Sequence, residues 1–112
     1  LTQLVGLNRA KYLMFTGEFL PAATLQDWGL VNEVVPDEEL QRRVGEVVNS
    51  ISSKSPIGLA RMKRLVQSGA GLPRETALWH EQYVSHAHLH SADRKEGLAA
   101  FIEKRVPAFK GS

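Results

Sequence analysis

One short segment of this chain favours a β-strand, and the rest favours helix. Residues 30–35, Leu-Val-Asn-Glu-Val-Val, are rich in β-branched side chains and lie between Gly29 and Pro36, which interrupt regular structure. A strand leaves its backbone N–H and C=O groups unpaired unless another strand lies beside it, and the sequence offers no clear second one. We therefore expect a mainly α chain whose first third is the edge of something larger.

Two helices are predicted before this segment. The first follows Gly6, with Asn8 as its N-cap and Gly17 as its left-handed stop. The second is short, begins at Pro21 and ends at Gly29. The first helix has an apolar face at the i, i+3, i+4 spacing, made by Ala10, Leu13 and Met14.

Helix dominates after Pro36. Asp37 is expected to cap a helix, Ser55 and Pro56 to start a second one, and Ser91 to cap the last. The four expected helices start at Asp37, at Pro56 (to about Gln67), at Pro73 (to about His90) and at Ala92 (to Arg105). The first carries an apolar stripe of Leu40, Val44, Val47, Val48 and Ile51.

Composition narrows the class of protein. The 112 residues, 43% hydrophobic and 23% charged, are ordinary for a soluble globular chain of one domain's size. A net charge of +2 is too small to indicate a nucleic-acid partner. The chain has no cysteine, which excludes disulfides, and no apolar run near the roughly 20 residues that a membrane helix needs.

Three histidines form the most distinctive cluster of possible ligands. His86 and His90 would lie one helical turn apart, a spacing used by two-imidazole metal sites, with His88 between them. Zinc would need a third ligand, and neither Glu81 nor Asp93 obviously projects to the same point. The alternative is a polar helix face with solvated histidines, and we expect no metal site.

No catalytic centre is visible in the residues themselves. Residues 68–73, Ser-Gly-Ala-Gly-Leu-Pro, contain two glycines but lack the Lys-Ser/Thr pair of a phosphate-binding loop and follow no strand. The glutamates lie on charged helices, without the apolar surroundings that would raise a carboxyl pKa for acid–base work. From its chemistry alone, the chain is a helical module.

The segments in their order resemble the C-terminal part of the enoyl-CoA hydratase/isomerase (crotonase) superfamily. The resemblance rests on "LVGLNRAKYLMFTG", "GLVNEVVPDEEL", "SPIGLARMKRLV" with its lysine at Lys63, and "SADRKEGLAAFIEKRVPAFKG". It covers essentially the whole chain. It implies that residues 1–36 end the family's α/β core, with one short strand, and that residues 37–112 form its C-terminal helical (trimerisation) region near the CoA site.

The family's catalytic parts are expected outside this chain. The resemblance implies an enzyme that hydrates or isomerises enoyl-CoA thioesters, using an oxyanion hole and catalytic acids upstream of residue 1. No catalytic residue is expected within the 112 residues, which should be inactive alone, and no cofactor is expected, since the CoA thioester is the substrate. The expected location is cytoplasmic, or mitochondrial or peroxisomal in a eukaryote.

The resemblance assigns a binding role to two residues of the last helix. Phe101 is expected against the CoA or acyl region, and Lys104 near a CoA phosphate, where a compact ammonium suits an anion. The terminal helices are expected to join copies of the protein into a trimer or a dimer of trimers. The alternative is plain packing of the apolar side chains and solvation of the cations, a set made of Leu98, Phe101, Ile102, Lys104, Arg105 and Val106.

Two other functions compete with the enzyme fragment. A non-catalytic crotonase-like interaction module would keep these helices for self-association alone. A metal-binding helical protein would use the three histidines. Upstream sequence with two acids and a glycine-rich oxyanion loop would favour the enzyme, and a zinc titration would test the metal site.

Overall fold

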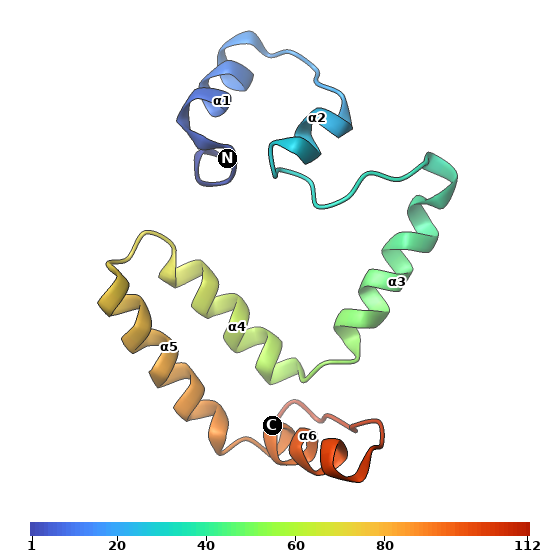
Figure 1. Ribbon diagram of the computed structural model, residues 1–112, viewed down its shortest axis with the longest axis vertical. Helices are drawn as coiled ribbons and strands as arrows, with labels where there is room; N and C mark the ends of the chain where they lie inside the picture. Colours follow the sequence, from blue (N-terminus) through green and yellow to red (C-terminus); the bar gives the residue numbers. More distant parts are fainter. The chain divides into compact units, whose positions relative to one another are not determined.

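A computed structural model describes all residues from 1 to 112 and contains helices but no strand (Figure 1). The mainly α prediction is therefore confirmed. No helix is both long and apolar enough to span a membrane. The elements are α1 (Thr2–Thr16), α2 (Ala22–Asp27), the 3-10 helix η1 (Asp37–Glu39), α3 (Leu40–Ser52), α4 (Pro56–Gly69), α5 (Arg74–Leu89) and α6 (Ala92–Glu103).

The predicted strand at residues 30–35 is not formed. The segment begins as a turn in which the N–H groups of Leu30 and Val31 donate to the carbonyl of Leu25, at 2.9 and 3.4 Å. Gly29 permits this turn with a φ of 75°. The chain contains no other strand, so a strand here would have unpaired backbone groups.

The local signals for α1 and α3 are partly confirmed. Gly17 ends α1 in the left-handed conformation, and its N–H donates to Leu13, as predicted. Asn8, however, lies inside α1, which starts at Thr2 and is broken by the non-helical backbone of Gly6. Asp37 opens η1 without a capping hydrogen bond, because Pro36 occupies the N-cap position.

The chain divides into two compact units, Leu1–Gly45 and Glu46–Ser112, and the division lies within α3. The domain boundary after residue 36 stays a prediction. In the first unit, Tyr12 meets the Trp28 ring edge-on with a centroid separation of 6.5 Å. The guanidinium of Arg9 lies 5.0 Å from the centroid of the same ring. Trp28 is thus the aromatic centre of this unit, which otherwise buries little beyond Val5 and Ala10.

The helices of the second unit start where the sequence predicts. The Ser55 hydroxyl accepts from the Gly58 N–H and caps α4, with Pro56 in the first turn. The Ser91 hydroxyl accepts from the Arg94 N–H in the same way and caps α6. The helix α5 begins just after Pro73.

Asp93 is the most buried charged residue, with 2% of its surface exposed. Its carboxylate accepts from the Ser55 hydroxyl at 2.6 Å and from the N–H groups of Lys110 and Gly111 at 2.8 and 3.0 Å. Its own N–H donates to the carbonyl of Ser112 at 3.0 Å. One side chain therefore connects the start of α4, the start of α6 and the end of the chain.

Hydrogen bonding outweighs burial in setting the charge of Asp93. Burial raises its pKa, but the hydrogen bonds from Ser55, Lys110, Gly111 and Ser112 together hold the pKa below its ordinary value. A depressed pKa means that this stabilisation is present above the ordinary value of 3.8 and is lost as the pH falls through the folded value.

Glu96 makes the second connection between α6 and the tail of the chain. Its carboxylate accepts from the Arg105 guanidinium through both terminal nitrogens and from the Ala108 N–H at 2.7 Å. The Arg105 bond, helped by the Ala108 amide, lowers the pKa of Glu96 from 4.5 to about 2. The Phe109 ring lies against Gly97, where an added Cβ would meet the ring at 3.4 Å. The tail after Pro107 is therefore folded back along α6.

We predict that Asp93→Asn frees the end of the chain. An amide supplies one acceptor oxygen where the carboxylate supplied two, so either the Ser55 hydroxyl or the tail amides lose their acceptor, and the bonds that remain lose the negative charge that strengthens them. Hydrogen exchange at the Lys110 and Gly111 amides should accelerate roughly tenfold or more. The control is Asp27→Asn, which removes an exposed carboxylate that makes no hydrogen bond and should leave these amides unchanged. Unchanged exchange in Asp93→Asn would contradict the connecting role.

Candidate functional site

Phe101 and Lys104 lie at the end of α6, and the chain buries neither. Phe101 stands in the last turn with 83% of its surface exposed, so its ring is not part of a core within this chain. Lys104 follows the helix as its C-cap. Both side chains are therefore open to a ligand or to another polypeptide.

The backbone of Lys104 has the left-handed conformation, with φ 53° and ψ 38°. It is the one residue other than glycine with a positive φ in the chain. A side chain in this region costs about 1 kcal/mol or more relative to glycine, which would cap the helix equally well. The Lys104 ammonium makes no hydrogen bond or ion pair, so nothing within the chain explains a lysine at this position.

The guanidinium of Arg105, the neighbouring cation, is bound to two carboxylates within the chain. Besides its paired bonds to Glu96, its Nε donates to Glu103 at 2.6 Å. The bond to Glu96 and the bond to Glu103 raise the pKa of Arg105, so the guanidinium stays charged and partnered. Of the two cations that end α6, Lys104 is the one available to an anion.

The apolar neighbours of Phe101 do not pack within the chain either. Leu98, Ile102 and Val106 are all exposed, as is Phe101. The alternative of plain packing therefore requires a surface that residues 1–112 do not contain. Together with Lys104, this set forms an exposed face with an apolar part and one cation, which we call the α6 face.

The structure brings no third ligand to His86 and His90. The rings of His86 and His90 meet edge-on with a centroid separation of 5.6 Å, and no group of three His, Cys, Asp or Glu side chains in the chain is placed to hold a metal ion. His88 has another role. Its Nδ1 lies 3.0 Å from a guanidinium nitrogen of Arg61 and 3.2 Å from the Ser91 hydroxyl. Since arginine can only donate, Nδ1 is the acceptor in this contact.

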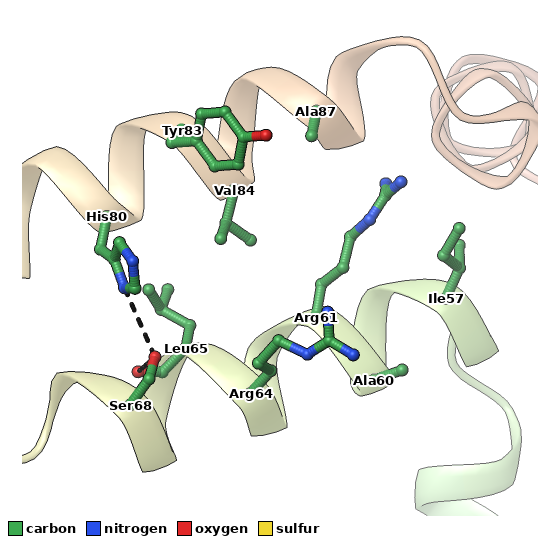
Figure 2. Close-up of a pocket in the computed structure, with 10 residues that line it drawn as sticks. All are labelled: Ile57, Ala60, Arg61, Arg64, Leu65, Ser68, His80, Tyr83, Val84 and Ala87. Carbon is green, nitrogen blue, oxygen red and sulfur yellow. Dashed lines mark hydrogen bonds between the residues drawn. The ribbon is translucent and has the colours of Figure 1, made fainter.

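A groove of about 410 Å³ separates α4 from α5 (Figure 2). Its lining contains Arg61 and Arg64 from α4 and His80 and Tyr83 from α5, and no acidic residue. No prediction from the sequence included this groove. The available signal was the i, i+3 spacing of the two arginines on a helix without acidic residues, which places both guanidiniums on one face.

The comparisons with known proteins agree over the length of the chain. The family model of enoyl-CoA hydratase/isomerase matches residues 1–112. A short-chain-enoyl-CoA hydratase of Clostridium acetobutylicum is 35% identical over 111 residues, which are 98% of this chain and 42% of the relative. The Arabidopsis thaliana protein named "Probable enoyl-CoA hydratase 2, mitochondrial" is 34% identical over 112 residues, 100% of this chain and 37% of the relative.

A solved structure has the same fold. The crystal structure of enoyl-CoA hydratase from Bacillus anthracis matches with a TM-score of 0.93 and 36% identity, over 99% of this chain and 43% of that one. The chain thus spans about two fifths of the length of the relatives it matches. Because the family model and these relatives match nearly every residue, the chain belongs to the enoyl-CoA hydratase/isomerase family.

Proposed function

We propose that this chain is the C-terminal part of an enoyl-CoA hydratase or isomerase, and that it supplies oligomer contacts and part of the CoA site. The observation that carries the proposal is the α6 face, in which an ammonium without a partner in the chain and an exposed aromatic ring belong to the same helix end. The names of the relatives support acyl-CoA as the substrate class.

The chemical step belongs to the part of the enzyme that these residues do not include. Hydration or isomerisation of an enoyl thioester develops negative charge on the thioester oxygen, and preorganised N–H donors stabilise that charge. The resemblance assigns those donors and the catalytic acids to the polypeptide upstream of residue 1. Within residues 1–112, Asp93 and Glu96 are held ionised by structural hydrogen bonds and are therefore poor proton donors near neutral pH. The reaction needs no cofactor besides the CoA of the substrate.

In this proposal, Lys104 binds a CoA phosphate and Phe101 contacts the CoA or acyl group. A lysine suits a phosphate as a compact point charge, and Lys104 has no competing carboxylate. Phe101 offers an exposed apolar ring three residues before it, so one helix end provides one contact for each half of an amphipathic ligand.

The homo-oligomer, a trimer or a dimer of trimers, is also a proposal. The apolar stripe of α3 remains 41–52% exposed at each of its five positions, Leu40, Val44, Val47, Val48 and Ile51. Apolar stripes of this length on a helix indicate a contact surface. For the location of the protein we propose the cytoplasm, or a mitochondrion or peroxisome in a eukaryote.

We predict that the purified 112-residue chain does not hydrate crotonyl-CoA, whereas the complete polypeptide that carries it does. The reason is that an oxyanion hole is needed for the step and the chain provides none by the proposal. Turnover by the sequence-verified 112-residue chain would refute the assignment of catalysis to the upstream part. A complete polypeptide that oligomerises but leaves crotonyl-CoA and its positional isomers unchanged would favour the non-catalytic interaction module.

We predict that Lys104→Gly in the complete enzyme raises KM for a CoA thioester about fivefold or less and leaves kcat unchanged. Glycine keeps the left-handed cap, so the variant removes the ammonium without disturbing α6. A solvent-exposed ion pair is worth roughly 1 kcal/mol, and its loss affects substrate and transition state equally.

The comparison substrate is a pantetheine thioester, which lacks the nucleotide phosphates. KM for this substrate should not change in Lys104→Gly, and high salt should diminish the effect on the CoA thioester. Lys54→Ala is the control for net charge, since Lys54 is exposed and lies outside α6. Equal increases of KM for both thioesters would show that the helix end acts by packing and not by phosphate binding.

We predict that the 112-residue chain self-associates at high micromolar concentration. Its exposed apolar stripe on α3 has no cover within the chain, and burial of apolar surface contributes roughly 25 cal/mol per Å². Sedimentation velocity should show oligomers, and Val48→Glu, a charge in the middle of the stripe, should shift them towards monomer. A wild-type chain that sediments as a monomer would refute the prediction.

A further inference from the structure

The groove between α4 and α5 has cations and no counter-charge. Arg61 extends from α4 into the space between the helices, and Arg64 lies along α4 with its guanidinium near the base of Arg61 (Figure 2). The carboxylates on these two helices, Glu75 and Glu81, do not line the groove. Some guanidiniums elsewhere in the chain pair with carboxylates, as Arg43 does with Glu33 and Arg105 with Glu96. Two unpaired guanidiniums in one groove repel each other, and an anion between them would remove that repulsion.

The donors in the groove are only partly used. Arg61 gives one N–H to His88, which leaves its other N–H groups unassigned. Arg64 and the Tyr83 hydroxyl make no hydrogen bond. Guanidinium groups match carboxylate and phosphate oxygens with paired N–H donors, and the Tyr83 hydroxyl can add another. This set of donors therefore favours a phosphate or a carboxylate.

Contacts across the two helices define the extent of the groove. At one end, the Ser68 hydroxyl on α4 lies 3.4 Å from Nδ1 of His80 on α5 (Figure 2). Towards the other end, Arg61 contacts His88. Leu65 and Val84 provide an apolar lining between these contacts, and Ile57 adds an apolar side chain beyond Arg61 (Figure 2). The ligand must therefore combine an anionic head with an apolar body.

We propose that this groove is a binding site for a small amphipathic anion, with a phosphate or carboxylate head on Arg61 and Arg64 and an apolar body against Ile57, Leu65 and Val84. Its volume of about 410 Å³ lies within the range of roughly 300–1,000 Å³ that small-molecule sites have. An acidic protein segment is a poorer match, since a stable protein interface covers about 800 Å² on each partner. The site lies on α4 and α5 and uses neither Phe101 nor Lys104. A result that refutes this site would therefore leave the proposed CoA contact unaffected, and the reverse also holds.

The test is calorimetric titration of the complete natural polypeptide with four probes that share parts of this chemistry. Octyl phosphate and octanoate carry both an anionic head and an apolar body, octanol lacks the charge, and inorganic phosphate lacks the body. We expect the two amphipathic anions to bind roughly tenfold or more tightly than either partial probe, because only they use both kinds of contact. Comparison of octyl phosphate with octanoate shows which head group the arginines prefer.

Variants locate the binding. Arg64→Gln should weaken octyl phosphate binding roughly tenfold and leave octanol unaffected, and it removes no hydrogen bond that the fold uses. Lys63→Gln is the matched control, because it removes the same charge from the neighbouring position of α4, outside the groove lining. Should Arg64→Gln fail to fold, Tyr83→Phe keeps the ring, removes a head-group donor and should also weaken binding.

Three results would overturn the proposal. The first is that octyl phosphate and octanoate bind no better than octanol. This result is expected if another part of the polypeptide or an acidic partner segment fills the groove. Equal losses in Arg64→Gln and Lys63→Gln would show a response to net charge alone. Ring signals of Tyr83 that do not shift on titration, observed by NMR, would place the probe elsewhere.

Discussion

The second unit depends on a single buried carboxylate. Asp93 accepts from a side chain that caps α4 and from backbone amides at the end of the chain, while its own backbone belongs to the first turn of α6. An ionised carboxylate carries no hydrogen-bond donor, and its two oxygens can each accept more than one hydrogen bond. It can therefore accept from several N–H and O–H groups at once. The left-handed Gly111, with a φ of 79°, allows the last amides to turn towards it. These bonds fix the orientation of α6 relative to the start of α4, and with it the placement of Phe101 and Lys104.

Polar contacts, rather than apolar packing, fix the positions of the helices in the second unit because little apolar surface is buried. Val5, Ala10 and Ala100 are the buried apolar residues, whereas the α3 stripe and the α6 face stay open. Hydrogen bonds can fix the direction of a segment, but the free energy that holds a domain together comes mainly from apolar burial. By the proposal above, surfaces outside these 112 residues cover the open faces of α3 and α6. Relatives more than twice as long, of which this chain covers about two fifths, have the material to provide them.

Sequence reasoning succeeded where the cause is local and failed where it is not. Ser55, Ser91 and Gly17 act on backbone groups within four residues, so their roles as helix caps could be predicted from spacing. The strand at residues 30–35 needed a partner that the chain does not contain. Asp93 was missed as a structural residue because its partners lie 17 to 38 positions away in the sequence. The placement of Phe101 and Lys104 on one helix end was predictable, but their exposure became known only from the structure.

The cations of the second unit fall into two groups with different physical roles. Arg105 is paired with two carboxylates and holds the tail against α6, so its charge is neutralised within the fold. Lys104, Arg61 and Arg64 have no carboxylate partner, and each lies beside exposed or groove-lining apolar residues. A cation kept without a counter-charge contributes little to folding, and a lysine in a left-handed cap is unfavourable compared with glycine. Both proposed sites therefore combine an apolar surface with cations that no carboxylate of the chain neutralises, a combination suited to ligands that have a charged head and an apolar body.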